Sequence, residues 1–438
     1  MQTIRIGGGA GFSGDRLEPA VLLAREGNLD YLVLECLAER TIALAQQRKL
    51  QDPTIGFDPL LERRMETLLP VILKNGVRLI SNFGAANPVA AAQKIVELAK
   101  RKGISVTVAA VTGDEVLDQL DPDMQTMETG RPLSQYRGII SANAYLGVEA
   151  LLPALESGAD IIVTGRVADP SLFLAPMVHA FGWSVVDYAK LGQGTVIGHL
   201  LECGAQICGG YFMDGHRKSV PDPARLGFPI AEVSSDGSAT ISKIVGTGGR
   251  IDLRTAKEQL LYEVVDPHAY LTPDVAADFT TVHLEATGTD AVSVNGGSGD
   301  RKPDTLKVSV GYRAGYRGEG EISYAGPGAE SRARLAGEIV AERLSGQLDQ
   351  LRVDIIGVDS VHLSVGQSAE PREARVRVSG AAATGVIAAR VGEEVVALYS
   401  NGPWGGGGAR KSTAEMVGIV SVLLNRTLIS PSLEIFSV

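Results

Sequence analysis

The chain of 438 residues is longer than one hydrophobic core usually serves, so we expect two domains. Apolar residues make up 45% and charged residues 21%, a balance that is typical of globular proteins and excludes a largely disordered chain. The formal charge of -10 disfavours nucleic acid as a partner, because such a protein repels phosphate groups. No apolar run approaches the roughly 18 residues that span a bilayer, so no membrane association is expected.

The cysteine and histidine residues indicate the compartment and argue against a metal site. Three cysteines, an odd and small number for this length, are typical of a reducing compartment. The opening residues resemble a strand and have neither the charged nor the apolar region of a signal peptide. We therefore predict a cytoplasmic protein. Because no C-x-x-C or H-x-x-x-H pair occurs, no metal site is predicted.

Short β-branched runs alternate with helical stretches through the first half of the chain. The expected strands cover residues 3–6, 31–34, 78–81, 105–111, 138–141 and 160–164. Between them lie helical patterns such as residues 88–102. Continuous apolar strands separated by helices predict an α/β domain with a mostly parallel sheet flanked by helices. We place this domain at residues 1–220.

Pro221, Pro223 and Pro229 mark a change of composition after residue 220. Alternating polar and apolar positions with Gly and Asp turns then predict antiparallel strands. These strands are expected at residues 239–245, 280–286, 291–294, 306–312, 319–324, 352–356 and 374–378, with helices at 329–344 and 384–399 and a Gly-rich loop at 405–408. Residues 221–438 are therefore predicted to form a C-terminal α+β domain.

Polar and small residues follow each strand expected in the parallel sheet. Parallel strands end at one edge of a sheet, and ligands bind outside these carboxyl ends. Asp15 follows the first strand, and Asn82, Asp114, Asn143 and Arg166 follow later ones. We therefore expect these side chains to line one cleft.

The loop after the first strand contains Gly9, Gly11 and Gly14, and Glu35 ends the second strand. This spacing fits the fingerprint of dinucleotide binding. A dinucleotide-binding helix would begin inside the loop, whereas Pro19 favours a helix that begins later, because proline prefers the first turn. NAD(P) binding is thus the less favoured interpretation, beside an anion-binding backbone nest and a purely structural turn.

Three carboxylates just past predicted strands are candidates for general acid–base catalysis: Asp15, Asp114 and Asp169. The alternative is that they cap the following helices. Arg166 follows a buried apolar strand, where its guanidinium would bind a carboxylate or phosphate, or would only form an ion pair with Asp169 that holds the loop. The candidate substrate-binding residues are Gly11, Ser13, Arg16, Asn82, Asn143 and Arg166. His199, Glu202 and Cys203 share one face of an expected helix, as reactive groups or as ordinary core residues.

Several of these segments together resemble the acyclic terpene utilisation (AtuA) family. The resemblance is carried by residues 9–16 (Gly-Ala-Gly-Phe-Ser-Gly-Asp-Arg), 30–35, 82–84, 158–169 and 401–403, and it extends over essentially the whole chain. The family is named for growth on citronellol and geraniol, whose degradation passes through branched acyl-CoA thioesters. Its members commonly occur with, or fused to, a small domain that carries a Ser-Gly-Asp-Lys-Gly-Asp motif. This sequence lacks that motif, so the resemblance implies that such a partner would be a separate chain.

These observations lead to a hydratase or lyase that acts on an organic acid or its CoA thioester. Arg166, with Arg16, would bind the carboxylate; Asp15 and one of Asp114 or Asp169 would move protons; and the side-chain amides that follow the third and fifth strands would orient the acyl oxygen. No cofactor is expected, with CoA only as part of the substrate. The alternatives are an NAD(P)-dependent oxidoreductase and a non-catalytic large subunit beside a small partner chain. A homo-oligomer is expected in each case.

Overall fold

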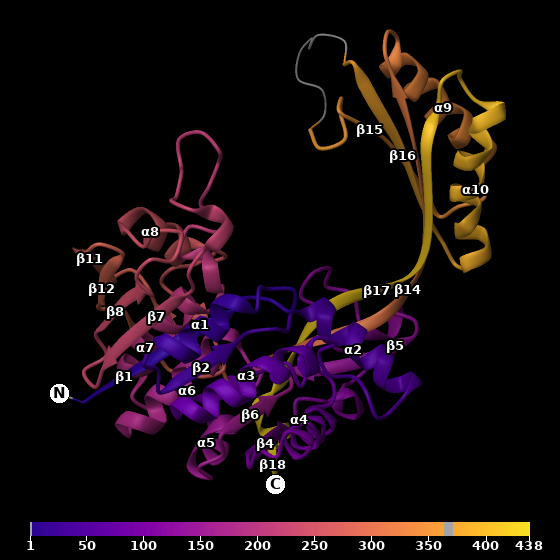
Figure 1. Cartoon of the computed structure of the whole chain (residues 1–438). Helices are drawn as coiled ribbons and strands as arrows, with labels where there is room; N and C mark the ends of the chain where they lie inside the picture. The colour runs from indigo at the N-terminus through magenta and orange to yellow at the C-terminus, as the bar shows by residue number, and fades with distance from the viewer. Residues whose placement is uncertain (1, 363–370) are drawn as a thin grey trace. The chain divides into compact units, whose positions relative to one another are not determined.

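The computed structural model describes residues 2–362 and 371–438 (Figure 1). The chain divides into two compact units. Unit 1 comprises Met1–Gln135, Ile140–Gly311 and Ile419–Val438, and unit 2 comprises Tyr136–Ile139 and Tyr312–Gly418. The division does not fall at residue 220, where the composition changes. The reason is that strands beyond residue 220 pair with the first strand, and the last strand returns to the same sheet.

Within the part of the chain that the structure describes, five parallel strands form the middle of the large sheet of unit 1. In spatial order they are β1 (Thr3–Ala10), β2 (Tyr31–Leu34), β3 (Arg78–Ser81), β6 (Ile161–Thr164) and β4 (Thr107–Thr112). Every residue of β2 and β6 is buried, as expected of strands covered on both faces. The predicted mostly parallel α/β sheet is confirmed here. All five strands end at one edge, which we call the carboxyl edge.

Antiparallel strands extend this sheet on both sides. Outward from β1 they are β7 (Pro229–Ser234), β8 (Ala239–Lys243), β12 (Ala291–Asn295) and β11 (His283–Gly288), and on the other side β18 (Ser432–Ser437) pairs with β4. The sequence predicts β7 to β12 to be part of a second domain. Their antiparallel character is correct, but they lie in unit 1 because β7 pairs with β1 along Thr3–Gly7.

Helices cover both faces of the parallel strands. One face packs against α1 (Glu18–Glu26), α3 (Leu61–Asn75) and α4 (Pro88–Lys102), and the other faces α5 (Val148–Glu156), α6 (Asp169–Phe181) and α7 (Tyr188–Glu202). Successive residues of a strand point to opposite faces. Accordingly, a Cβ at Gly9 would meet Ala20 of α1, whereas a Cβ at Gly8 would lie 2.7 Å from the carbonyl oxygen of Leu201 in α7.

The segment predicted as the fifth parallel strand lies outside the large sheet. It forms β5 (Ile139–Ala144), which pairs with β14 (Thr305–Ala325) instead. Asn143 is therefore part of this strand rather than of a loop that follows it. It still reaches the carboxyl edge, because Asn143 forms an isolated bridge with Glu115, just past β4.

Two further groups of elements complete unit 1. Helix α2 (Glu39–Gln51) follows β2, and α8 (Leu253–Leu261) packs against α7. A small antiparallel sheet of β13 (Ser298–Asp300), β10 (Ala276–Asp278) and β9 (Tyr270–Leu271) lies against α7 as well. Because α7 is enclosed by these neighbours and by the large sheet, nearly all of its second half is buried.

Unit 2 is built on a second sheet, with the strand order β15 (Gln350–Ile356), β16 (Glu373–Ala382), β14 and β17 (Gly407–Asn425). Strand β16 is antiparallel to both β15 and β14, as predicted for this part of the chain. Helices α9 (Ala329–Arg343) and α10 (Gly385–Asn401) pack on one face (Figure 1). Of the predicted Gly-rich loop at 405–408, the last two glycines already belong to β17, and Arg332 holds the residue before the loop by donating from Nη1 to the carbonyl of Trp404 at 2.9 Å.

Candidate active site

Arg166 is a fully buried cation just past β6, with 2% of its surface exposed. Its Nη2 donates to Oδ1 of Asp169 at 2.8 Å, and its guanidinium carbon lies 4.1 Å from the centre of the Tyr145 ring. Within the described residues, Nε and Nη1 are buried without a hydrogen-bond partner. Leaving buried donors unpaired costs about 1–3 kcal/mol, so this side chain has unused capacity to bind an oxygen atom.

Asp114 holds the backbone that carries Arg166. Its Oδ2 accepts hydrogen bonds from the Arg166 backbone N and from Nδ2 of Asn143, both at 2.9 Å. Gly165 permits this approach, because a Cβ there would lie 2.5 Å from the carboxylate. Burial raises the pKa of Asp114 to about 6. Asp114 and Asn143 thus brace the loop after β6, so the structure brings Asp114, Asn143 and Arg166 together, while the cleft that they are expected to line stays a prediction.

Glu35 and Asn82 form a second buried pair at the same edge. Oε1 of Glu35 accepts hydrogen bonds from Nδ2 of Asn82 at 2.9 Å and from the Leu37 backbone N at 2.7 Å. Oδ1 of Asn82 accepts from the Cys36 backbone N at 2.7 Å. Burial, followed by the negative charge of Asp169, raises the pKa of Glu35 to about 8. At neutral pH Glu35 therefore keeps its proton near Arg166.

Tyr145 connects Arg166 to a carboxylate on α2. Its hydroxyl donates to Oε1 of Glu39, and Nζ of Lys307 lies 3.2 Å from the same oxygen. Burial acts to raise the pKa of Glu39, but the Tyr145 hydroxyl, Arg166 and Lys307 together lower it to about 2. Glu39 is thus a permanent anion beside the Arg166–Tyr145 stack.

Like Glu39, whose side chain is 38% exposed, Asp169 is a carboxylate of this cluster that solvent reaches, with 35% of its side chain exposed. Its pKa is raised, because desolvation and the negative charges of Glu39 and Glu263 together outweigh the opposing charge of Arg166. It begins α6, with Pro170 next to it in the first turn. A partly exposed carboxylate with a raised pKa, bonded to a buried guanidinium, is suited to exchange protons with a ligand.

The first loop is brought to the same edge, where its groups form hydrogen bonds with one another and with neighbouring segments. Oδ2 of Asp15 accepts from the Gly11 backbone N at 3.0 Å, and Oδ1 accepts from the Arg16 backbone N at 2.8 Å. The Ser13 carbonyl accepts from buried Arg64. Arg16 is exposed and donates to the Ala224 carbonyl at 2.7 Å, so the structure does not join it to Arg166. Burial raises the pKa of Asp15 despite its backbone hydrogen bonds.

The glycines of the first loop are explained by packing. Helix α1 begins at Glu18 with Pro19 in its first turn, as predicted, so no helix begins inside the loop. A Cβ at Gly11 would fall 2.5 Å from the backbone of Cys203. Glu35 is occupied by its two hydrogen bonds rather than presented to a ribose. The fingerprint binds a dinucleotide through a helix that begins inside the loop and through an acidic side chain that faces the ribose. Neither feature is present at this loop and Glu35.

Tyr145, Glu39 and Arg64 are the residues that the sequence reasoning missed. Tyr145 directly follows the strand of Asn143, and Glu39 starts the helix after Glu35, so position along the chain was the available signal. Pairing between them could not be foreseen, because 106 residues separate the hydroxyl and the carboxylate.

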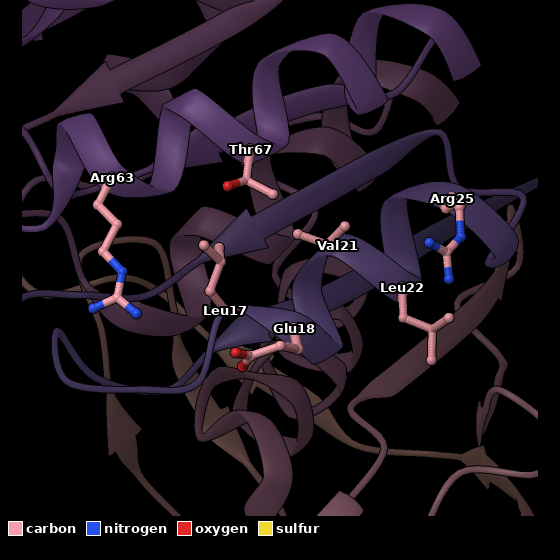
Figure 2. Close-up of a pocket in the computed structure, with 7 residues that line it drawn as sticks. All are labelled: Leu17, Glu18, Val21, Leu22, Arg25, Arg63 and Thr67. Carbon is pink, nitrogen blue, oxygen red and sulfur yellow. The ribbon is translucent and has the colours of Figure 1, made fainter.

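A surface hollow lies elsewhere in unit 1, between α1 and α3. It is lined by Leu17, Glu18, Val21, Leu22, Arg25, Arg63 and Thr67. Figure 2 shows Arg63 and Arg25 at opposite ends, with Leu17 and Val21 between them. None of the predicted site residues lines it.

The comparisons with known proteins identify the family. The family model described as acyclic terpene utilisation family protein AtuA matches residues 4–435 of the chain. The chain belongs to this family. Neither the comparison with curated proteins nor that with solved structures gives a match. Membership of the AtuA family implies a role in terpene utilisation.

Two further properties of this AtuA-family chain bear on its site. Among the described residues, no group of three or more His, Cys, Asp or Glu side chains is placed to hold a metal ion. None of the helices in the described ranges has the length and apolar character needed to cross a bilayer.

Proposed function

We propose that this protein is a hydratase- or lyase-type enzyme that moves protons on an organic acid or a branched acyl-CoA thioester. The observation that carries the proposal is Arg166, a fully buried guanidinium whose Nε and Nη1 have no partner in the described part of the chain. A carboxylate or thioester oxygen would satisfy these donors while Asp169 keeps Nη2. The family's role in terpene utilisation supports such a substrate.

The proposed roles of the carboxylates follow from their hydrogen bonds. Asp15 and Asp114 each accept two hydrogen bonds that hold loops, so they act as braces. Asp169 is exposed enough to reach a ligand, so it takes the proton from the carbon next to the acyl group. The electron pair of that C–H bond moves toward the acyl oxygen, where Arg166 stabilises the developing charge. Glu35, protonated at neutral pH, keeps the surroundings of Arg166 from carrying a further negative charge.

Two variants at one ion pair test the anion-binding role of Arg166. Arg166→Lys keeps the charge but loses the planar donors and the stacking on Tyr145, so we expect affinity for the ligand to fall about tenfold or more. Asp169→Asn removes a negative charge that competes for the same guanidinium, so affinity should stay or rise while turnover is lost. Binding is measured by thermal shift and calorimetry with a panel of branched acyl-CoA thioesters and the free acids.

The different changes in ligand affinity that the two variants should cause distinguish an anion-binding Arg166 from one that only forms a structural ion pair. If Arg166 only holds the loop through Asp169, both variants lower the melting temperature and neither changes ligand affinity. Saturable quenching of the tryptophan fluorescence by NADH would favour the oxidoreductase instead. Turnover that requires a small partner chain would identify this protein as the large subunit of a complex.

A further inference from the structure

The hydrogen bonds of His199 fix the position of one of its protons. Its Nε2 lies 3.0 Å from the backbone carbonyl of Gln259, and a carbonyl only accepts, so Nε2 carries a proton. Its Nδ1 lies 2.9 Å from Oε1 of Glu202. A hydrogen bond between those atoms needs one more proton, held by Nδ1 or by Oε1. The pair is therefore either neutral histidine with a protonated Glu202 or an imidazolium with a carboxylate.

This pair is enclosed, so losing its shared proton is costly. His199 is 1% exposed and Glu202 is 8% exposed, and the imidazole ring packs against Tyr270 and Phe279, each with ring centres 5.4 Å away. Burial, with the negative charges of Asp169 and Glu263, raises the pKa of Glu202 to about 7 even though His199 acts to lower it. Cys203 and Tyr270 are the other titratable groups that face it, and the pKa of each is raised by burial and by the charge of Glu202.

Glu202 has a second oxygen that the protein does not use. Within the described residues, Oε2 is buried and has no hydrogen-bond partner. Because an unpaired buried oxygen is unfavourable, Oε2 is available to a ligand atom or to a proton. His199, by contrast, has both ring nitrogens engaged and can only hold Glu202 in place.

The packing of α7 on α6 brings Glu202 to the carboxyl edge. Gly198 lies against α6, where a Cβ would fall 2.7 Å from the carbonyl oxygen of Pro170. Glu202 is one helical turn farther along the same face, where the negative charge of Asp169 acts on it. Just beyond it, a Cβ on Gly204 would lie 3.0 Å from the Gly11 backbone N and 3.2 Å from the Asp15 carboxylate. The end of α7 thus lies beside the same loops that carry the candidate site.

We propose that Glu202 is the proton donor that the reaction needs in addition to Asp169, and that His199 is the positioning residue that holds the Glu202 carboxyl group in place. This inference rests on the proposed function. Asp169 takes a proton from carbon, the C–O bond to a neighbouring hydroxyl breaks as a C=C bond forms, and Glu202 gives its proton to the departing oxygen, which leaves as water. Asp169 is then protonated and Glu202 ionised, so one proton transfer between them restores the starting state.

The shared proton can be tested without any substrate, by NMR of the full-length protein with 15N-labelled histidine. The chain has six histidines, and His199→Asn assigns the signal. In the wild type we expect Nε2 to stay protonated, while the Nδ1 signal reports the loss of the Glu202 proton, whose pKa burial raises to about 7. Glu202→Gln can donate to Nδ1 permanently, so its Nδ1 signal should not titrate. A wild-type Nδ1 signal that is flat from about pH 6 to 9 would overturn the inference.

The same titration tests whether the pair belongs to the site. Asp169→Asn removes a negative charge near Glu202, so it should lower the apparent pKa of the pair. Glu97→Gln removes an exposed charge on α4, and it should leave that titration unchanged. Equal titration curves for Asp169→Asn and the wild type would place the pair outside the site.

Turnover of an acyl-CoA from the binding panel gives the functional readout. Because general acid catalysis typically contributes 10²- to 10⁴-fold, Glu202→Gln should lower kcat by about 100-fold or more. It should leave the melting temperature and ligand affinity nearly unchanged. If Glu202→Gln turns over like the wild type, the proton-donor role is wrong even though the proposed function stands. If no acyl-CoA or free acid binds, the proposed function fails, and the NMR titration still decides whether the pair holds a proton.

Discussion

At the scale of single residues, Glu35 shows how burial at the end of a strand raises the pKa of a carboxyl group. Its carboxyl group is 6% exposed, and its Oε1 accepts two hydrogen bonds. Such bonds favour an anion, yet burial outweighs them and raises the pKa to about 8 from an ordinary value of 4.5. The folded protein therefore keeps a proton at neutral pH that the unfolded chain has released.

This linkage makes stability fall as pH rises. Between about pH 4.5 and 8 the folded state binds more protons than the unfolded state, so the contribution of Glu35 is complete below this window and is lost through it. Glu35→Gln keeps an oxygen for both hydrogen bonds and cannot ionise. We expect its melting temperature to match the wild type near pH 5 and to exceed it by a few degrees near pH 8. Glu97→Gln, at an exposed position, should follow the wild-type pH dependence; a Glu35→Gln curve parallel to the wild type would contradict this account.

At the scale of elements, the loop after β1 shows that glycines at the spacing of a dinucleotide-binding loop can be required by close packing instead. Its glycines allow close approach to the end of α7 and to the side chains on α1 and β2. The two glycines that complete the fingerprint differ in what surrounds them. Gly11 faces the backbone of Cys203, whereas Gly14 faces only the ring of Phe12, which is 60% exposed and free to turn.

Gly11→Ala and Gly14→Ala therefore form a matched pair. Gly11→Ala forces two backbone segments apart and should lower the free energy of unfolding by about 1–3 kcal/mol. Gly14→Ala displaces one exposed ring, so it should change stability by less than about 0.5 kcal/mol. Urea denaturation measures both. Similar destabilisation by the two variants would show that the close approach at Cys203 is not what requires glycine.

At the scale of the whole molecule, the two units have separate hydrophobic cores. In unit 1 the core lies between the parallel strands and helices α1, α3 and α4. In unit 2 it is formed by the second sheet with α9 and α10, and Ile322 and Val395 are among its fully buried residues. All of the candidate site residues, including Glu202 and Tyr145, lie in unit 1.

Separate cores predict that unit 2 can be weakened without loss of the site. Ile322→Ala empties a buried position and should lower the stability of unit 2 by about 2–5 kcal/mol. Calorimetry should then show a lower first transition, while binding of the acyl-CoA probe to unit 1 stays unchanged. Val386→Ala, at a position 82% exposed on α10, is the control and should leave the transition where it is. A single transition that shifts as a whole would show that the two units unfold together.

Local patterns in the sequence determined most of the elements and their order. The alternation of apolar strands and helices gave the parallel sheet, and Pro19 gave the start of α1, because periodicity and proline geometry act over a few residues. Parallel strands end on one edge whatever their order, so Asp114 and Arg166 could be expected to meet. The family was also evident in short segments spread along the chain.

Tertiary structure alone decided which strands share a sheet and which charges share a site. The pairing of β7 with β1 and of β5 with β14 depends on contacts between distant segments, and strand propensity does not encode a partner. The composition change after residue 220 therefore did not mark the boundary of a unit. The protonation of Glu35 and Glu202 likewise depends on contacts between distant segments. Burial and neighbouring charges set it, and both arise only when α6, α7 and the sheet are packed together.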